Sequence, residues 1–143
     1  MTDIHNKLSL TWTGGKAGAG RITSGHIGGD LAMPAGHGGT GKGLDPKSLL
    51  AASAAECLIL NLVAILEASG VEHGPISIET VAQGSGGAGI AIDHHLTLSL
   101  SVDGAANDRV GRLIEKAEAG CNIGNLLKSA GVGIDLTHSI ARI

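Results

Sequence analysis

The sequence predicts a single α+β domain that spans residues 1–143. Three observations lead to this fold class. One long apolar segment has the length of a helix, and two alternating runs behind it have the pattern of paired strands. The chain of 143 residues also suits one domain with its own core. The elements follow in the order strands, long helix, hairpin, helix, short helix and strand, which differs from a regular βαβ alternation.

The region before the long helix predicts short strands separated by glycines. Residues 8–13 alternate between apolar and polar side chains, and they form the clearest of these strands. Two weaker patterns follow, with the pair Gly28-Gly29 as the break between them. They cover residues 21–27 and residues 31–33. Residues 34–44 predict a glycine-rich loop.

The long helix has a clear start and a clear end. Asp45 suits the N-cap and Pro46 the first helical position, while Gly70 suits the left-handed position after the last turn. The apolar length approaches that of a membrane span. However, Glu56 near its centre would cost roughly 2.5–3.5 kcal/mol on the insertion scale. We therefore expect a buried helix of a soluble protein and no membrane partner.

The second half of the chain predicts a hairpin, two helices and a final strand. Residues 75–82 and 90–102 alternate and are joined by a turn at residues 84–87. Residues 106–119 form an amphipathic helix, and a short helical turn follows Cys121. One face of the amphipathic helix carries Val110, Leu113, Ile114 and Ala117. The closing strand is predicted at residues 133–142.

Composition excludes several classes of function. The net charge of −3 gives no basic surface, and Trp12 is the only aromatic side chain, so nucleic acid is not an expected partner. Two cysteines are too few for a disulfide-stapled secreted domain. The N-terminus also lacks the basic and then apolar pattern of a signal peptide. We therefore expect a cytoplasmic protein.

Two other motifs imitate binding sites. The run of residues 36–43 nearly spells a phosphate-binding loop, but Gly43 stands where Ser or Thr must hold magnesium. Seven histidines are present, yet none forms an i, i+4 pair on a helix. The adjacent His94 and His95 lie on a strand and should point to opposite faces. We expect surface or hairpin histidines here, with neither a nucleotide nor a metal bound.

The two cysteines are the strongest candidates for chemistry. Cys57 lies in the long apolar helix beside Glu56, and these are the only ionisable groups between Ser48 and Leu66. Cys121 precedes a helix, and a helix N-terminus favours a thiolate. A buried free cysteine is also common as a small hydrophobic residue. A carboxyl in an apolar helix, in contrast, needs a partner or a function.

The cysteine motifs resemble those of the OsmC/Ohr family of thiol peroxidases. The segment DPKSLLAASAAEC, which ends at Cys57, is similar to the family helix Asn-Pro-Glu-x-Leu-x-Ala-Ala-x-x-Ala-x-Cys. The segment CNIGN, which begins at Cys121, resembles the second motif Cys-Pro-x-Ser-Asn. The two cysteines are 64 positions apart, and the loop, hairpin and closing strand occur in matching order. The resemblance covers nearly the whole chain.

This resemblance implies an OsmC-like fold, in which antiparallel sheets wrap around long central helices in an intertwined homodimer. It also implies that Cys57 attacks an organic hydroperoxide and becomes a sulfenic acid. Cys121 then condenses with it to a disulfide, which an external dithiol, typically on a lipoylated protein, reduces. No metal, haem or other cofactor is required.

The chain departs from the family pattern close to this site. The family has a Glu ten residues before the first cysteine, paired with an Arg from the N-terminal strands, whereas this chain has Lys47. Arg21 or Lys16 matches the family Arg. Our hypothesis is that Glu56 supplies the lost carboxylate and pairs with Arg21, or with Lys47 of the partner subunit. The alternative function is an OsmC-like dimer without peroxidase activity that binds a small apolar ligand.

Overall fold

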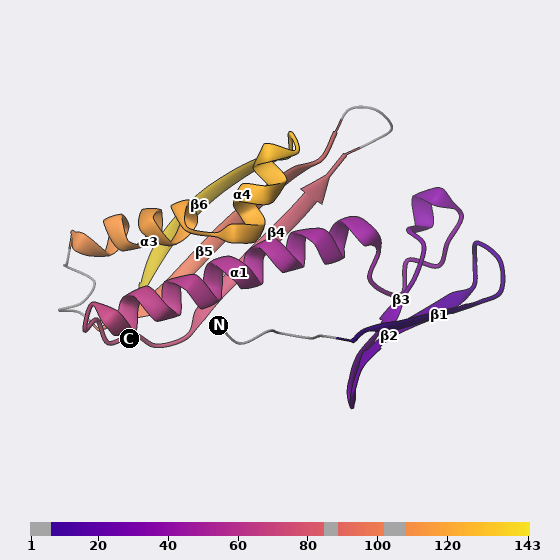
Figure 1. Cartoon of the computed structure of the whole chain (residues 1–143), viewed down its shortest axis with the longest axis horizontal. Helices are drawn as coiled ribbons and strands as arrows, with labels where there is room; N and C mark the ends of the chain where they lie inside the picture. The colour runs from indigo at the N-terminus through magenta and orange to yellow at the C-terminus, as the bar shows by residue number, and fades with distance from the viewer. Residues whose placement is uncertain (1–6, 85–88, 102–107) are drawn as a thin grey trace. The chain divides into compact units, whose positions relative to one another are not determined.

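The computed structural model describes residues 7–84, 89–101 and 108–143. Contacts divide the chain into two units, residues 1–49 and residues 50–143. Each unit holds one three-stranded sheet, and the helix α1 (Pro46–Ala68) begins in the first unit and continues through the second (Figure 1). Strands and helices are combined without regular alternation, so the α+β class is confirmed.

The sheet of the first unit is an antiparallel meander of three strands. They are β1 (Ser9–Thr13), β2 (Ala19–Ser24) and β3 (Ile27–Leu31). The strand predicted at residues 8–13 is confirmed as β1. The predicted loop at residues 34–44 contains one short 3-10 helix, η1 (Ala35–His37).

The predicted break at Gly28-Gly29 was wrong. The chain turns earlier, at Gly25, whose φ of +62° is left-handed, and both later glycines lie inside β3. Gly28 is needed there for close packing, because a Cβ atom would come within 2.7 Å of the carbonyl oxygen of Ile22. The predicted strand at residues 21–27 therefore merged the end of β2 with the start of β3.

Both predicted ends of α1 are confirmed. The carboxylate of Asp45 accepts a hydrogen bond from the backbone N–H of Ser48 at 3.4 Å and another from its hydroxyl group. These bonds, led by that from the hydroxyl, lower the pKa of Asp45. At the other end Gly70 takes the left-handed conformation, with a φ of +68°.

The sheet of the second unit is mixed, although the sequence analysis expected antiparallel sheets. β4 (Ile76–Gln83) and β5 (Ala91–Leu100) form the predicted antiparallel hairpin, whereas β6 (Gly133–Arg142) pairs with β5 in parallel. The chain between β5 and β6 contains α3 (Arg109–Ala119) and α4 (Asn122–Ser129), which make the crossover that parallel pairing requires.

Some predicted segments fall partly on residues outside the described ranges. They are residues 85–87 of the hairpin turn, the last residue of the strand at 90–102, and the first two residues of the helix at 106–119.

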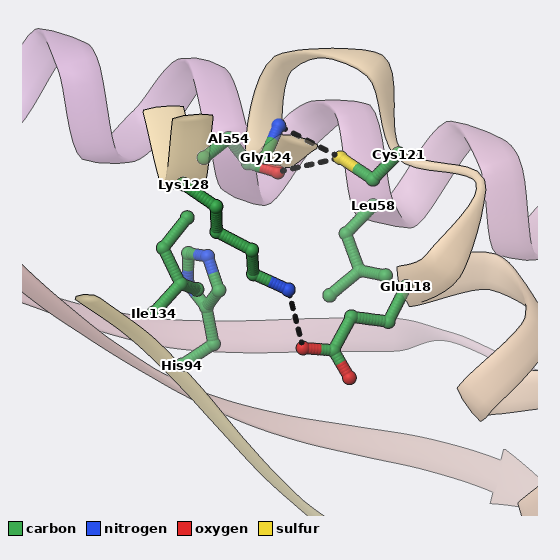
Figure 2. A pocket seen from close by; sticks show the side chains of 8 residues that line it. All are labelled: Ala54, Leu58, His94, Glu118, Cys121, Gly124, Lys128 and Ile134. Carbon is green, nitrogen blue, oxygen red and sulfur yellow. Dashed lines mark hydrogen bonds and ion pairs between the residues drawn. The ribbon is translucent and has the colours of Figure 1, made fainter. Parts of the chain in front are cut away.

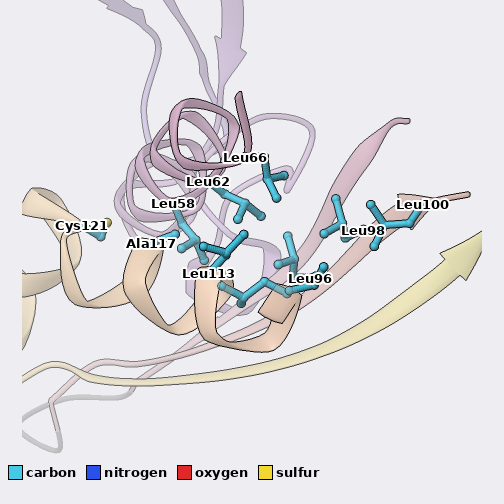
Figure 3. Close-up of a cluster of buried hydrophobic side chains, with 11 residues drawn as sticks. Leu58, Leu62, Leu66, Leu96, Leu98, Leu100, Leu113, Ala117 and Cys121 are labelled. Carbon is cyan, nitrogen blue, oxygen red and sulfur yellow. The ribbon is translucent and has the colours of Figure 1, made fainter. Parts of the chain in front are cut away.

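One face of this second sheet packs against the helices (Figure 1). The main core cluster joins leucines of α1 and β5 with the apolar face of α3, and Cys121 lies at its edge (Figure 3). The buried face of α3 consists of the four predicted residues, Val110, Leu113, Ile114 and Ala117. The prediction of this amphipathic helix is confirmed.

The helix α1 is apolar on all sides, and only part of it is covered. Among the helices in the described residues, α1 alone is long and apolar enough to cross a membrane. Of its apolar segment, 33% is buried within the chain. An exposed stripe runs along it through Ser53, Glu56, Leu60 and Ala64. Leu60 is 60% exposed. An exposed apolar surface of this kind is typical of an interaction site.

Candidate active site

Cys121 is the N-cap residue of α4 and is buried, with 4% of its surface exposed. Its Sγ accepts a hydrogen bond from the backbone N–H of Gly124 at 3.4 Å. The thiol also lies 3.9 Å from the carbonyl oxygen of Ala54 on α1, to which it donates (Figure 2). The sulfur is thus fixed between the start of α4 and the middle of α1.

The turn that carries Cys121 is tied to the end of α3 by two asparagines. Asn61 on α1 donates from Nδ2 to the carbonyl oxygen of Ala117 at 2.7 Å. Asn125 on α4 donates in the same way to the carbonyl oxygen of Ala119 at 2.9 Å. The last carbonyls of a helix have no partner within the helix, and these two side chains supply one. Both bonds therefore fix the position of Cys121.

The structure brings Cys57 and Cys121 together as two unbridged thiols. Cys57 is partly buried and packs against the same core cluster as Cys121. Burial raises the pKa of Cys121, and so do a side-chain hydrogen bond with Cys57 and the charge that Cys57 can carry. The two side chains are therefore close neighbours, with Cys57 the more accessible.

The predicted effect of the helix N-terminus on Cys121 is present but is not the largest one. The N–H group of Gly124 lowers the pKa of the thiol, as expected for a helix start, but burial acts in the opposite direction and is stronger. The net shift of the pKa is upward because burial outweighs the effect of the helix start. Cys121 needs a proton acceptor before it can act as a nucleophile.

Glu56 is exposed on α1. Within the described residues its carboxylate has neither a hydrogen bond nor an ion pair. It lies in the exposed stripe of α1 with Leu60, where solvent can hydrate the charge. The proposed pairing of Glu56 stays a prediction.

Arg21 lies on β2, in the first unit, and pairs with Asp30 directly opposite on β3. The distance between Arg21 Nη1 and Asp30 Oδ1 is 2.9 Å, and both side chains are more than half exposed. The sequence analysis did not identify Asp30 as this partner, because a carboxylate nine positions away is adjacent only through strand pairing. Lys16, the other candidate cation, is exposed in the turn between β1 and β2.

A small cavity lies beside Cys121 and was missed by the sequence analysis. Besides Cys121, three of its lining residues carry ionisable groups, namely His94 on β5, Glu118 on α3 and Lys128 on α4 (Figure 2). Lys128 Nζ and Glu118 Oε1 form an ion pair at 3.3 Å. The cavity measures about 10 Å³, which is close to the space needed by one water molecule. Apolar side chains complete its walls.

His94 lies in the predicted hairpin, on β5, but its side chain is buried, with 4% exposed. Its neighbour His95 is exposed on the other face of the sheet, so the predicted opposite orientation is confirmed. The alternation of β5 held a usable signal, since His94 falls in the same inward row as Ile92 and Leu96. Within the described residues, no group of three potential ligands is placed to hold a metal ion.

Comparison with known proteins agrees with this fold. The family described as "OsmC-like protein" matches residues 39–137. An uncharacterized protein of Bacillus subtilis, YmaD, is 29% identical, and the match covers 98% of this chain and 97% of that protein. The chain therefore belongs to the OsmC-like protein family.

Solved structures show the same fold. An OsmC-like protein from Mycoplasma pneumoniae matches with a TM-score of 0.76 and 15% identity, covering 98% of this chain and 99% of the other. The organic hydroperoxide resistance protein OhrB of Bacillus subtilis matches with a TM-score of 0.60 and 25% identity, covering 93% and 98%. The predicted membership of the OsmC/Ohr family is thus confirmed.

Proposed function

We propose that the protein is a thiol-dependent peroxidase that reduces organic hydroperoxides to alcohols. The observation that carries this proposal is the pair of neighbouring thiols, with Cys57 partly exposed and Cys121 buried. The pair belongs to an OsmC-like chain, and a relative that is 25% identical is described as an organic hydroperoxide resistance protein. The difference in exposure suits a first cysteine that meets the substrate and a second that acts only afterwards.

The first step is attack by the Cys57 thiolate on one oxygen of the hydroperoxide. The O–O bond breaks, the sulfur gains the terminal oxygen as a sulfenic acid, and the other oxygen leaves and takes a proton to become the alcohol. The sulfur supplies both electrons. Because Cys57 is partly exposed on α1, substrate can approach it while Cys121 remains covered.

In the second step, the Cys121 thiolate attacks the sulfenic sulfur of Cys57. An S–S bond forms, the S–O bond breaks, and the oxygen leaves as water. An external dithiol then reduces this disulfide by exchange, which restores both thiols and leaves a disulfide on the reductant. A lipoylated protein is the reductant that the family resemblance implies. This scheme uses neither a metal nor haem.

We propose that the protein works as a homodimer. The uncovered stripe of α1 includes Leu60, which is 60% exposed, and β1 exposes Leu10 and Trp12 on one face. Apolar surfaces of this kind on both units favour burial against a second copy. The Glu56 carboxylate lies in the same stripe, so a dimer would give it access to Lys47 of the partner subunit or to Arg21.

The dimer is tested by measuring mass in solution by light scattering. Leu60→Lys should shift the protein towards monomer because it places a charge in the proposed interface. Val81→Lys is the matched control, since Val81 is 54% exposed on β4, opposite Asp93. Equal dimer content in both variants would contradict an interface on this face of α1.

The peroxidase activity is tested by stopped-flow mixing with cumene hydroperoxide and dihydrolipoamide. Wild type should consume the peroxide, and Cys57→Ser should lose this activity because serine cannot form a sulfenic acid. Cys121→Ser should still form the sulfenic acid but not the disulfide. Activity that is absent in wild type, or retained in Cys57→Ser, would refute the proposal.

Binding of a small apolar ligand is the alternative function, and the cavity beside Cys121 does not favour it. Its volume of about 10 Å³ suits one water molecule, and it contains a buried histidine and an ion pair. The first function is therefore the better supported of the two.

A further inference from the structure

His94 interrupts an otherwise apolar row of side chains. The inward residues of β5 are Ile92, His94, Leu96, Leu98 and Leu100, and the four aliphatic members are fully buried. A histidine in such a row costs free energy unless its polar atoms are satisfied. One ring nitrogen is satisfied by a second polar residue, Thr80, which lies opposite His94 in the inward row of β4.

The contact with Thr80 orients the imidazole ring. Thr80 Oγ1 and His94 Nδ1 are 2.9 Å apart. Within the described residues Nε2 has no hydrogen-bond partner. Every fully buried side-chain nitrogen or oxygen atom there does have a partner, so Nε2 is not fully buried. Nε2 therefore borders open space, and the cavity beside Cys121 is the space that His94 lines. If Nδ1–H donates to Thr80, the tautomer leaves Nε2 as an acceptor that faces this cavity.

Burial favours the neutral form of the ring at pH 7. Burial lowers the pKa of His94 and is the largest effect. Glu118 on α3 and Asp93 on β5 act in the opposite direction, while Lys128 on α4 lowers the pKa further. A neutral imidazole can accept a proton, and Glu118 is placed to stabilise the cation that results.

The second thiol needs such an acceptor. Cys121 is buried, and burial raises its pKa, so the thiol is mostly protonated at pH 7. The thiolate is the form that attacks sulfur. The Cys121 sulfur and His94 line the same cavity, which is large enough for one bridging water molecule.

We propose that this cavity is the proton outlet of Cys121 and that His94 accepts the proton as the disulfide forms. This inference rests on the proposed function and adds a residue to its second step. The S–H proton passes through one water to Nε2 while the Cys121 sulfur bonds to Cys57. The departing hydroxide takes up a proton from solvent, and the imidazolium releases its own proton through the mouth beside Glu118 and Lys128. The sulfenic acid of Cys57 and the thiol of Cys121 thus become one disulfide and one water molecule.

The test separates the two chemical steps in single turnovers. Wild type and His94→Asn are mixed with tert-butyl hydroperoxide, and quenched samples are trapped with dimedone for the sulfenic acid and with maleimide for remaining thiols. Asparagine keeps a donor to Thr80 but carries no titratable base. Sulfenic acid formation should be unchanged, whereas disulfide formation at pH 7 should slow at least tenfold. This threshold is conservative, because general bases typically contribute a factor of ~10²–10⁴.

The pH profile distinguishes a proton acceptor from a structural residue. In wild type the rate of disulfide formation should level off above the pKa of His94. In His94→Asn it should keep rising about tenfold per pH unit up to the pKa of Cys121, because it then follows the thiolate fraction. His95→Asn is the matched control, since it makes the same change one residue away on the outer face. A His94→Asn rate within twofold of the control, or a profile of the same shape, would overturn the proposal.

A second oxidant keeps this inference distinct from the peroxidase proposal. Diamide adds to the Cys57 thiolate, and Cys121 then displaces the hydrazine to form the same disulfide without any peroxide. If peroxide fails to oxidise Cys57, the proposed function is refuted, while the dependence of the diamide reaction on His94 still tests the proton outlet. Should His94→Asn unfold by circular dichroism, Thr80→Val provides the second variant. It keeps the base but releases its orientation, so the proposal expects the disulfide step to slow with the pH plateau retained, and an unchanged rate would contradict it.

Discussion

Replacing Cys121 should show that its sulfur caps α4. Serine should give a more stable protein than alanine at position 121, and the opposite order should hold at position 57. The sulfur accepts the hydrogen bond of the Gly124 N–H group at the first turn of α4. Serine retains an acceptor in this place, whereas alanine leaves the N–H group buried without a partner. Cys57 lies in the interior of α1, where serine is a poorer helix former than alanine. We therefore expect Ser to exceed Ala in stability at position 121, and Ala to exceed Ser at position 57.

The size of the effect follows from burial and from the cap. Cys121→Ala removes an N-cap acceptor, which costs about 1 kcal/mol, and a buried group of about the size of a methylene, which costs roughly 0.8 kcal/mol. Together these two losses lower the free energy of unfolding by about 2 kcal/mol. Both apply in full because Cys121 is only 4% exposed, so water does not replace the lost contacts. Cys121→Ser keeps the cap, so it should lie about 1 kcal/mol above the alanine variant.

The measurement is urea unfolding followed by circular dichroism, at one fixed protein concentration and with reductant present. A difference of about 1 kcal/mol corresponds to roughly 2–4 °C in Tm for a chain of this size. The same pair of variants at Cys57 supplies the control, with a difference of a few tenths of a kcal/mol in the opposite direction. If alanine proves as stable as serine at both positions, the Cys121 sulfur does not cap α4 and the reasoning fails.

Three further predictions concern other contacts of the structure. Asn61→Ala should cost about 1–3 kcal/mol in urea unfolding, because the carbonyl of Ala117 loses its partner at 2.7 Å; an unchanged midpoint would contradict this. Burial lowers the pKa of His94, so the unfolded chain binds a proton that the folded chain does not. The urea midpoint should therefore fall as the pH drops below about 6.5 towards the folded pKa, and His94→Asn should reduce this slope. Asp30→Asn should change stability by less than about 1 kcal/mol, since its pair with Arg21 is exposed, and a larger loss would show that this carboxylate has another role.

The features that the sequence predicted well are those set by neighbouring residues. The ends of α1 follow from Asp45 and Gly70, and the buried face of α3 follows from its helical period. Local signals also placed Cys121 at the start of a helix. The error at Gly28-Gly29 has a local cause too, because a glycine that allows close packing and a glycine that makes a turn have the same sequence signature.

The features that escaped prediction depend on residues far apart in the chain. The bond from Asn61 to Ala117 joins positions 56 apart, and the cavity gathers residues from α1, β5, α3, α4 and β6. Alternation along β5 showed that His94 and His95 face opposite ways, but it could not reveal what covers each face. The upward pKa shift of Cys121 has the same origin, since burial by α1 outweighs a helix start that the sequence did reveal.

Gly124 shows how this chain departs from the family motif without losing the cysteine turn. The family has a serine at this position, and a Cβ atom here would lie 3.3 Å from the Cys121 sulfur, closer than the usual 3.5–4.0 Å between nonbonded atoms. Glycine avoids this crowding, although it costs up to about 1 kcal/mol of helix propensity. Asn125 retains the family's asparagine and holds the end of α3 at 2.9 Å. The position of the sulfur therefore depends on the ends of α3 and α4 and on Asn61, and replacing the neighbouring proline and serine leaves these contacts in place.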